Sequence, residues 1–184
     1  GAKFSLQDYK GAINDYSKVI ELNPNNAVAY SNRVEGKMVL GDYQGAIDDS
    51  SKLIELDPND EYAYFNRGLA KAVLKDYQGA IEDYSKSIEL DPTNEDVYCK
   101  RGYLKRDLKD YQGAINDFSK AIELNPKFDD AIEERYKAIN KQKSKYDIPG
   151  SGNNNLDPFD FTLIVILICS VVFFVGIVFI LMIL

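Results

Sequence analysis

The residues that could do chemistry in this chain are charged side chains that recur at regular intervals. Arginine occurs at positions 33, 67 and 101, and aspartate recurs with the same period at positions 49, 83 and 117. A row of arginines could bind phosphate groups. The repeated aspartates favour a different use, in which arginine and aspartate form ion pairs inside the protein.

Other kinds of site find little support in the composition. The 184 residues include no histidine, which removes the commonest general base and most zinc-site patterns. No set of acidic residues has the close spacing of a calcium loop. We therefore expect no catalytic residues, no metal site and no cofactor.

The charge and the cysteine content indicate which class of partner and which cellular compartment suit this chain. The net charge of −7 and the lack of a basic cluster argue against nucleic acid as a partner. One of the two cysteines, Cys99, lies in the polar part and the other, Cys169, in an apolar run, so a disulfide between them is not expected. This usage predicts a reducing compartment.

An internal repeat organises the polar part of the chain. Prolines fall at positions 24, 58, 92 and 126, so the interval between them is constant. The segments before them align without a gap and begin at residues 8, 42, 76 and 110; the third reads DYQGAIEDYSKSIELDP. In it, Tyr77, Ile81, Tyr84 and Ile88 form one apolar stripe of a helix that Pro92 ends.

A second helix precedes each of these segments, as in AYFNRGLAKAVLK at residues 63–75. The aspartate of the short turn between the two helices, such as Asp76, is placed to cap the second one. Small residues such as Gly68 and Ala80 let the two helices approach closely. The repeating unit is therefore predicted to be a helical hairpin.

These residues resemble the tetratricopeptide repeat (TPR), a family of 34-residue helical hairpins that stack into a superhelix. The third and fourth repeats carry the pattern as Tyr64, Arg67-Gly68, Lys71, Ala80, Tyr84 and Pro92, and as Tyr98, Arg101-Gly102, Lys105, Ala114, Phe118 and Pro126. The resemblance implies an all-α superhelix without enzymatic activity.

The chain departs from the family pattern at a few positions. Lysine replaces an aromatic residue at positions 37, 71 and 105, Val34 replaces the glycine of the second repeat, and Ser50 replaces its aromatic residue. We expect these changes to loosen the packing without changing the fold.

Four segments follow from this alignment. Residues 1–128 are assigned to four repeats, the first of them incomplete because Gly1 aligns with Glu35, so we expect further sequence upstream. Residues 129–145 are expected to form a polar capping helix, with Ala131, Ile132, Tyr136 and Ile139 at helical spacing, and residues 146–160 a flexible linker.

The fourth segment, Phe161–Leu184, is predicted to be a transmembrane helix. It carries no charge, and only Thr162, Ser170 and Gly176 interrupt its apolar residues. A helix of this length reaches roughly 36 Å, enough to cross a hydrocarbon core of about 30 Å. Lysines at 137, 141, 143 and 145 precede it, which favours a single-pass protein with its repeats on the cytoplasmic side.

The resemblance also implies a partner-binding groove lined by the first helix of each hairpin. In that register the third repeat offers Tyr62, Phe65, Asn66, Leu69 and Val73, and the fourth offers Asp96, Cys99, Lys100, Tyr103 and Arg106. The second repeat offers Val28, Ser31, Asn32, Glu35 and Val39. Our candidate site comprises Tyr62, Phe65, Asn66, Leu69, Cys99, Lys100, Tyr103 and Arg106, although the larger apolar side chains could instead pack against neighbouring hairpins.

Chaperone co-factors of this family hold the carboxylates of a peptide's C-terminus with lysine, asparagine and arginine side chains on these helices. Asn32, Asn66 and Lys100 match that arrangement. Val28, Tyr62 and Asp96 do not supply the remaining cations, and Asp96 would repel a carboxylate. The sequence therefore argues against this ligand.

The hypothesis that follows is a membrane-anchored scaffold that binds a protein or peptide in its groove and contacts membrane lipid through its last segment. The alternative is an accessory subunit or assembly factor of a membrane protein complex, which would pack through the transmembrane helix. A third possibility is that the repeats regulate a catalytic domain encoded upstream.

Overall fold

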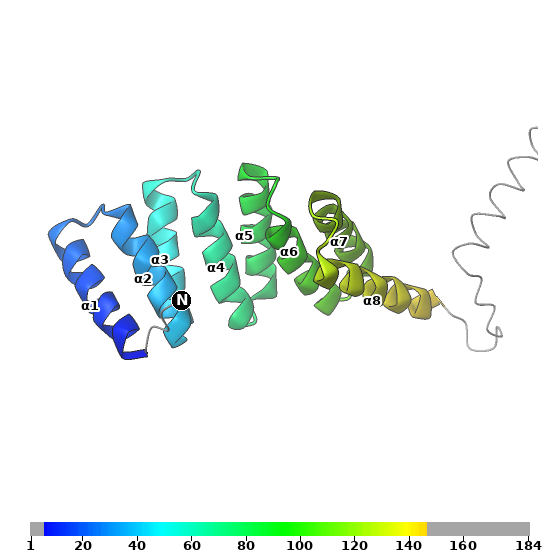
Figure 1. Ribbon diagram of the computed structural model, residues 1–184, viewed down its shortest axis with the longest axis horizontal. Helices are drawn as coiled ribbons and strands as arrows, with labels where there is room; N and C mark the ends of the chain where they lie inside the picture. Colours follow the sequence, from blue (N-terminus) through cyan, green and yellow to red (C-terminus); the bar gives the residue numbers. More distant parts are fainter. Residues whose placement is uncertain (1–5, 147–184) are drawn as a thin grey trace, which may run out of the picture. The chain divides into compact units, whose positions relative to one another are not determined.

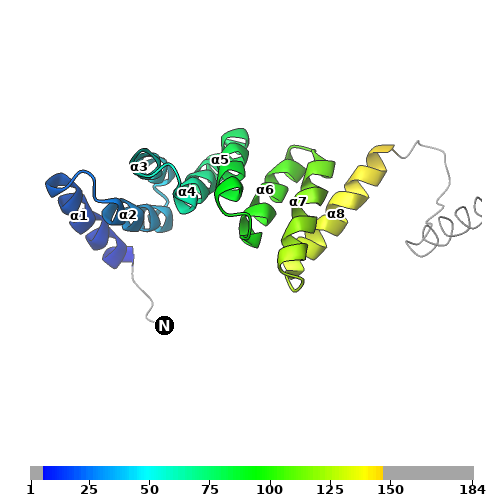
Figure 2. The same cartoon turned by 90° about the horizontal axis from the view of Figure 1, so that it is seen from above.

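A computed structural model describes residues 6–146 as eight α-helices that follow one another in a row (Figures 1 and 2). The helices are α1 (Leu6–Leu22), α2 (Ala27–Leu40), α3 (Tyr43–Leu56), α4 (Glu61–Val73), α5 (Tyr77–Leu90), α6 (Glu95–Asp107), α7 (Tyr111–Leu124) and α8 (Asp129–Tyr146). The described part of the chain is all-α, as predicted from the repeats.

The helices pair as the period of the repeat requires. Helices α2 and α3, α4 and α5, and α6 and α7 form three complete hairpins, and each helix packs against the next one in the chain. First helices also meet across the repeats, because α2 contacts α4 and α6 contacts α8. We call the outward surface of the first helices α2, α4 and α6 the first-helix face.

Each second helix begins at a capped turn that its sequence specifies. Asp42, Asp76 and Asp110 are N-cap residues, and the side chain of each accepts a hydrogen bond from the backbone N–H three residues later at 3.0–3.1 Å. That later residue is always glycine. A Cβ added at Gly45 would lie 2.2 Å from Oδ2 of Asp42, so the repeated Asp-Tyr-X-Gly sequence lets the aspartate close over the helix end.

Within each hairpin, glycine and an aromatic residue pack against each other in the buried core. A Cβ on Gly68 would lie 2.8 Å from the ring of Tyr84, and one on Gly102 would lie 2.8 Å from the ring of Phe118. Both rings are buried. The missing side chain on the first helix is therefore what makes room for the ring on the second.

The hairpin of the second repeat, formed by α2 and α3, fills the same space in another way. Val34 stands at the glycine position and Ser50 at the aromatic position, and both are fully buried. A larger residue on the first helix and a smaller one on the second keep the core filled. The two departures from the family pattern are thus one exchange, in which both side chains remain buried. The exchange leaves Ser50 Oγ buried without a hydrogen-bond partner in the described part of the chain.

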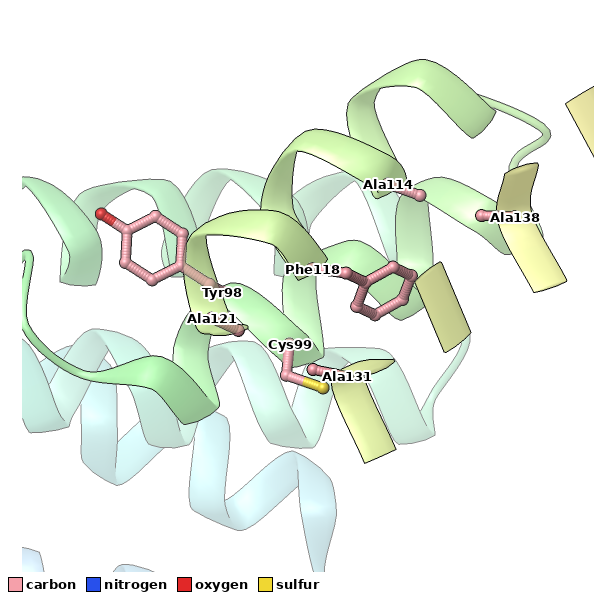
Figure 3. Packing of buried hydrophobic residues seen from close by; sticks show 7 residues of the cluster. All are labelled: Tyr98, Cys99, Ala114, Phe118, Ala121, Ala131 and Ala138. Atoms are coloured by element: carbon pink, nitrogen blue, oxygen red, sulfur yellow. The ribbon is translucent and has the colours of Figure 1, made fainter. Parts of the chain in front are cut away.

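Helix α8 packs on the last hairpin, and its surface is less polar than predicted. Ala131 and Ala138 are buried in the cluster that also holds Tyr98, Cys99, Ala114, Phe118 and Ala121 (Figure 3). Ile132 and Tyr136, which helical spacing places on the same stripe as Ala131, are exposed. Tyr146 is the last residue of α8 and not part of a linker.

The predicted linker after Tyr146 and the predicted transmembrane helix Phe161–Leu184 lie outside the described residues. Among the helices that the structure describes, none is long and apolar enough to cross a membrane.

The exchange between Val34 and Ser50 predicts strong coupling between the two positions. The substitution V34G should leave a cavity and S50Y should overpack the hairpin, so each alone should lower the free energy of unfolding by about 2 kcal/mol. The double variant restores the glycine and tyrosine of the third repeat and should recover at least about 1 kcal/mol of that loss.

Urea unfolding followed by circular dichroism measures all four forms. The matched control pairs V34G with S87A, in another hairpin, and should be additive. Additivity of V34G and S50Y as well would contradict the exchange.

Candidate partner-binding face

The first helices of the second and third repeats expose apolar side chains at equivalent positions. Val28 and Tyr62 lie near the start of α2 and α4 and are 70% and 62% exposed. Val39 and Val73 lie near the ends of the same helices and are about half exposed. Helices α3, α5 and α7, in contrast, expose no large apolar side chain in the described structure.

Two candidate residues on α4 contribute mainly to packing. Phe65 and Leu69 are partly buried against a cluster that includes Ala80, Tyr84 and Val97. The ring centroids of Phe65 and Tyr84 are 6.0 Å apart. Both side chains therefore support the hairpin and present only part of their surface to a ligand, while Asn66 is half-buried between them along the helix.

The first-helix face changes to a charged surface at α6. Asp96 and Lys100 are exposed. Tyr103 packs edge-on against Phe118 with centroids 5.6 Å apart, and Arg106 lies over the ring of Tyr103 at 5.3 Å. Arg106 also forms ion pairs with Asp107 of its own helix and Glu134 of α8. Its charge is therefore already neutralised in part.

Cys99 lies in the core and does not reach the surface. Its side chain is only 2% exposed and packs next to Ala131 of α8 (Figure 3). Burial raises the pKa of its thiol to about 11, against a smaller opposing effect of Lys100. The sequence placed Cys99 on the groove, and its burial under α8 corrects that placement: the thiol is neither accessible nor ionised near neutral pH.

The repeated arginines and aspartates form buried ion pairs, as the sequence favoured. Arg67 Nε and Nη2 donate to the two carboxylate oxygens of Asp83 at 3.0 and 2.6 Å. Lys71 Nζ lies 2.8 Å from the same carboxylate, and Arg67 Nη1 donates to Ser51 Oγ at 3.3 Å. The Asp83 side chain is only 5% exposed.

We call this set of four residues a rung, and residues 6–146 contain three of them. The other two are Ser17, Arg33, Lys37 and Asp49, and Ser85, Arg101, Lys105 and Asp117. In each rung the serine comes from the second helix of the preceding repeat. The arginine therefore joins two repeats as well as the two helices of its own hairpin. The hydrogen bonds that Arg33 and Arg67 donate to Asp49 and Asp83 raise the pKa of these two arginines.

The rungs also explain the lysines that depart from the family pattern. Lys37, Lys71 and Lys105 replace aromatic residues, and each supplies the second cation of its rung. The row of arginines is consequently occupied by carboxylates and is not free to bind phosphate. In residues 6–146 no group of acidic or cysteine side chains could hold a metal ion.

Comparison with known families agrees with this geometry. The family model described as tetratricopeptide repeat matches residues 61–94 and 95–128, and the one described as TPR repeat matches residues 2–33. Together they cover more than half of the chain. The chain belongs to the tetratricopeptide-repeat family.

Solved structures of TPR proteins resemble the chain over most of its described part. A crystal structure of MamA has 27% identity and a TM-score of 0.65, with 76% of this chain and 91% of MamA covered. The first TPR of Spaghetti (RPAP3), bound to the HSP90 peptide SRMEEVD, has 25% identity and a TM-score of 0.62, with coverages of 64% and 93%.

The second TPR domain of human RPAP3, in complex with the HSP70 peptide SGPTIEEVD, has 26% identity and a TM-score of 0.59, with 61% of this chain and 94% of that domain covered. No curated protein matches the chain. Its TPR domain is thus similar to TPR domains that bind peptides.

The rungs predict that a single buried carboxylate carries much of the stability of its hairpin. Replacing Asp83 by asparagine leaves the cations of Arg67 and Lys71 buried without their counter-charge, so D83N should lower the free energy of unfolding by about 3–5 kcal/mol.

The control for D83N is E89Q. Glu89 pairs with Lys86 at 2.9 Å on the exposed side of the neighbouring turn of α5, so this variant should cost less than about 1 kcal/mol. Chemical unfolding measures both, and equal costs for the two variants would show that the rung is no stronger than a surface ion pair.

Proposed function

We propose that this chain is a scaffold that binds a segment of a partner protein on its first-helix face and that it is anchored to a membrane by Phe161–Leu184. The observation that carries the first part is that α2 and α4 expose large apolar side chains whereas the second helices of their hairpins, α3 and α5, do not. Val28, Val39, Tyr62 and Val73 are exposed on α2 and α4, whereas the second helices of the complete hairpins expose polar residues. Apolar patches exposed in this way are typical of interaction sites.

The chemistry of the face suggests the kind of segment that it binds. An apolar surface on α2 and α4 is followed by Asp96 and Lys100 on α6. A segment with apolar residues at one end and charged residues at the other fits this order in one direction only. The similarity to TPR domains in complex with peptides supports a peptide segment as ligand.

The same face argues against the carboxylate-terminated peptides that RPAP3 binds. Asn32, Asn66 and Lys100 occupy the matching positions, but the exposed Asp96 carries a negative charge where a cation is needed. The negative charge of Asp96 would repel the carboxylate of such a peptide, and Val28 and Tyr62 supply no compensating positive charge. The peptide SRMEEVD is therefore a suitable negative probe.

The membrane anchor rests on the sequence of the last segment. Residues 161–184 carry no charge, and lysines at 137, 141, 143 and 145 precede them. We propose that the repeats face the cytoplasm or an equivalent reducing compartment and that the segment contacts lipid.

A photo-cross-linker at Tyr62 tests the binding face. Benzoylphenylalanine at this position in the full chain, irradiated in membranes of the source cells, should give one discrete cross-linked product. The same residue in place of Gln78, which is exposed on the second helix α5, is the matched control and should give none.

The product should disappear with V73D, because this half-exposed residue is on the same face, and it should persist in the presence of excess SRMEEVD. Equal cross-linking from both positions would show that the first-helix face is not the binding surface. Competition by SRMEEVD would assign a carboxylate-terminated ligand instead.

Membrane fractionation tests the anchor. Deletion of Phe161–Leu184 should move the chain from the carbonate-resistant pellet to the supernatant, because the remaining residues 1–160 contain no comparable apolar run. The full chain should stay in the pellet. Its migration after mild detergent extraction then separates a lone anchored protein from a subunit of a larger membrane complex, and recovery of the full chain in the supernatant would exclude the anchor.

A further inference from the structure

Helix α8 repeats the pattern of a first helix but has no second helix packed beside it in the described structure. Arg135 lies one repeat period after Arg101, and Ser119 on α7 lies one period after Ser85. Two of the four residues of a rung therefore recur at the end of the array, whereas Ile139 stands where the rungs have a lysine. Ile132 and Tyr136, 41% and 67% exposed, lie beside Arg135 on the same helix. We call Ile132, Arg135 and Tyr136 the α8 face.

The α8 face lacks the carboxylate that completes every other rung. In the three rungs the aspartate comes from the second helix of the hairpin, at Asp49, Asp83 and Asp117. In residues 6–146 the half-buried Arg135 forms no ion pair with an acidic residue and no hydrogen bond with Ser119. A partner that docks here gains most if it brings a carboxylate to Arg135.

Tyr136 restricts what can follow that carboxylate in the partner. It occupies the glycine position, one repeat period after Gly102. In the hairpins of the third and fourth repeats, the glycine makes room for an aromatic residue directly after the aspartate, which is Tyr84 or Phe118. Where a side chain fills this place, as Val34 does, the residue after the aspartate is the small Ser50.

We propose that the α8 face binds an amphipathic helix of another protein in which an aspartate is followed by a small residue. The aspartate pairs with Arg135, without the second cation that a lysine gives the three rungs, and the small residue lies against Tyr136. The helix takes the place of the second helix of a fifth hairpin. This site is separate from the first-helix face, so its failure would leave the proposed function unaffected.

The sequence argues against the two occupants that this protein could supply itself. After Tyr146 the aspartates are Asp147, Asp157 and Asp160, followed by isoleucine, proline and phenylalanine and never by a small residue. A second copy could offer α1, where the equivalent pair is Asp15 and Tyr16. That pairing would set Tyr16 directly against Tyr136.

The peptide of residues 43–56, YQGAIDDSSKLIEL, is a ready probe because it contains Asp49 and Ser50 in the required order. A fluorescent, helix-stabilised form is titrated with the full chain in detergent micelles, and anisotropy reports binding. The probe should bind saturably. Replacing its Asp49 by asparagine or its Ser50 by phenylalanine should weaken binding about ten-fold or more.

On the protein, R135Q should weaken binding of the unmodified probe by a similar factor. K141Q, which removes one positive charge from an exposed position of α8, is the matched control and should change it less than about two-fold. If the probe instead displaced the protein's own α3, which has the same sequence, its binding would depend on Arg33 and not on Arg135. Absence of saturable binding, equal binding of the phenylalanine peptide, or binding insensitive to R135Q would each overturn the proposal.

Discussion

The buried pairing of arginine and aspartate is the constraint on which the arrangement of the repeats depends. A carboxylate removed from water is costly unless cations and donors surround it. Each aspartate of a rung meets this requirement with a bidentate arginine and a lysine, within 2.6–3.0 Å. Because the arginine also reaches a serine of the preceding repeat, one interaction fixes both the hairpin and its place in the row. The first-helix face owes its geometry to these contacts.

Much of this fold could be predicted because each repeat states its own boundaries. Aspartate and glycine begin the second helix, and a proline that recurs once in every period ends it. The ion pairs could be predicted because arginine and aspartate recur with the same period. The exchange of Val34 and Ser50 was missed, although these residues have the same separation in the sequence as Arg33 and Asp49. The same offset applied to apolar residues would have identified the pair.

The binding face was harder to predict, because exposure depends on side chains of neighbouring helices that the period does not describe. Register alone placed Phe65 and Cys99 together with Tyr62. The structure leaves Tyr62 exposed, packs Phe65 near Tyr84, and covers Cys99 with Ala131 of α8. Whether each of these side chains is exposed depends on the residue that faces it on the neighbouring helix. A periodic sequence pattern therefore locates the face but not which of its residues a ligand can touch.

Identical repeats cannot by themselves distinguish one partner from another, so specificity must come from positions at which the copies differ. The second helices repeat almost the same exposed residues, with glutamine, lysine and glutamate at equivalent places in α3, α5 and α7. The first helices differ instead, from Val28 to Tyr62 to Asp96 at one position. The rungs make this variation tolerable, because they hold each first helix through residues on another side. The residues of the first-helix face can therefore vary while the rungs stay the same. This independence is the physical basis for the use of a repeat protein as a scaffold.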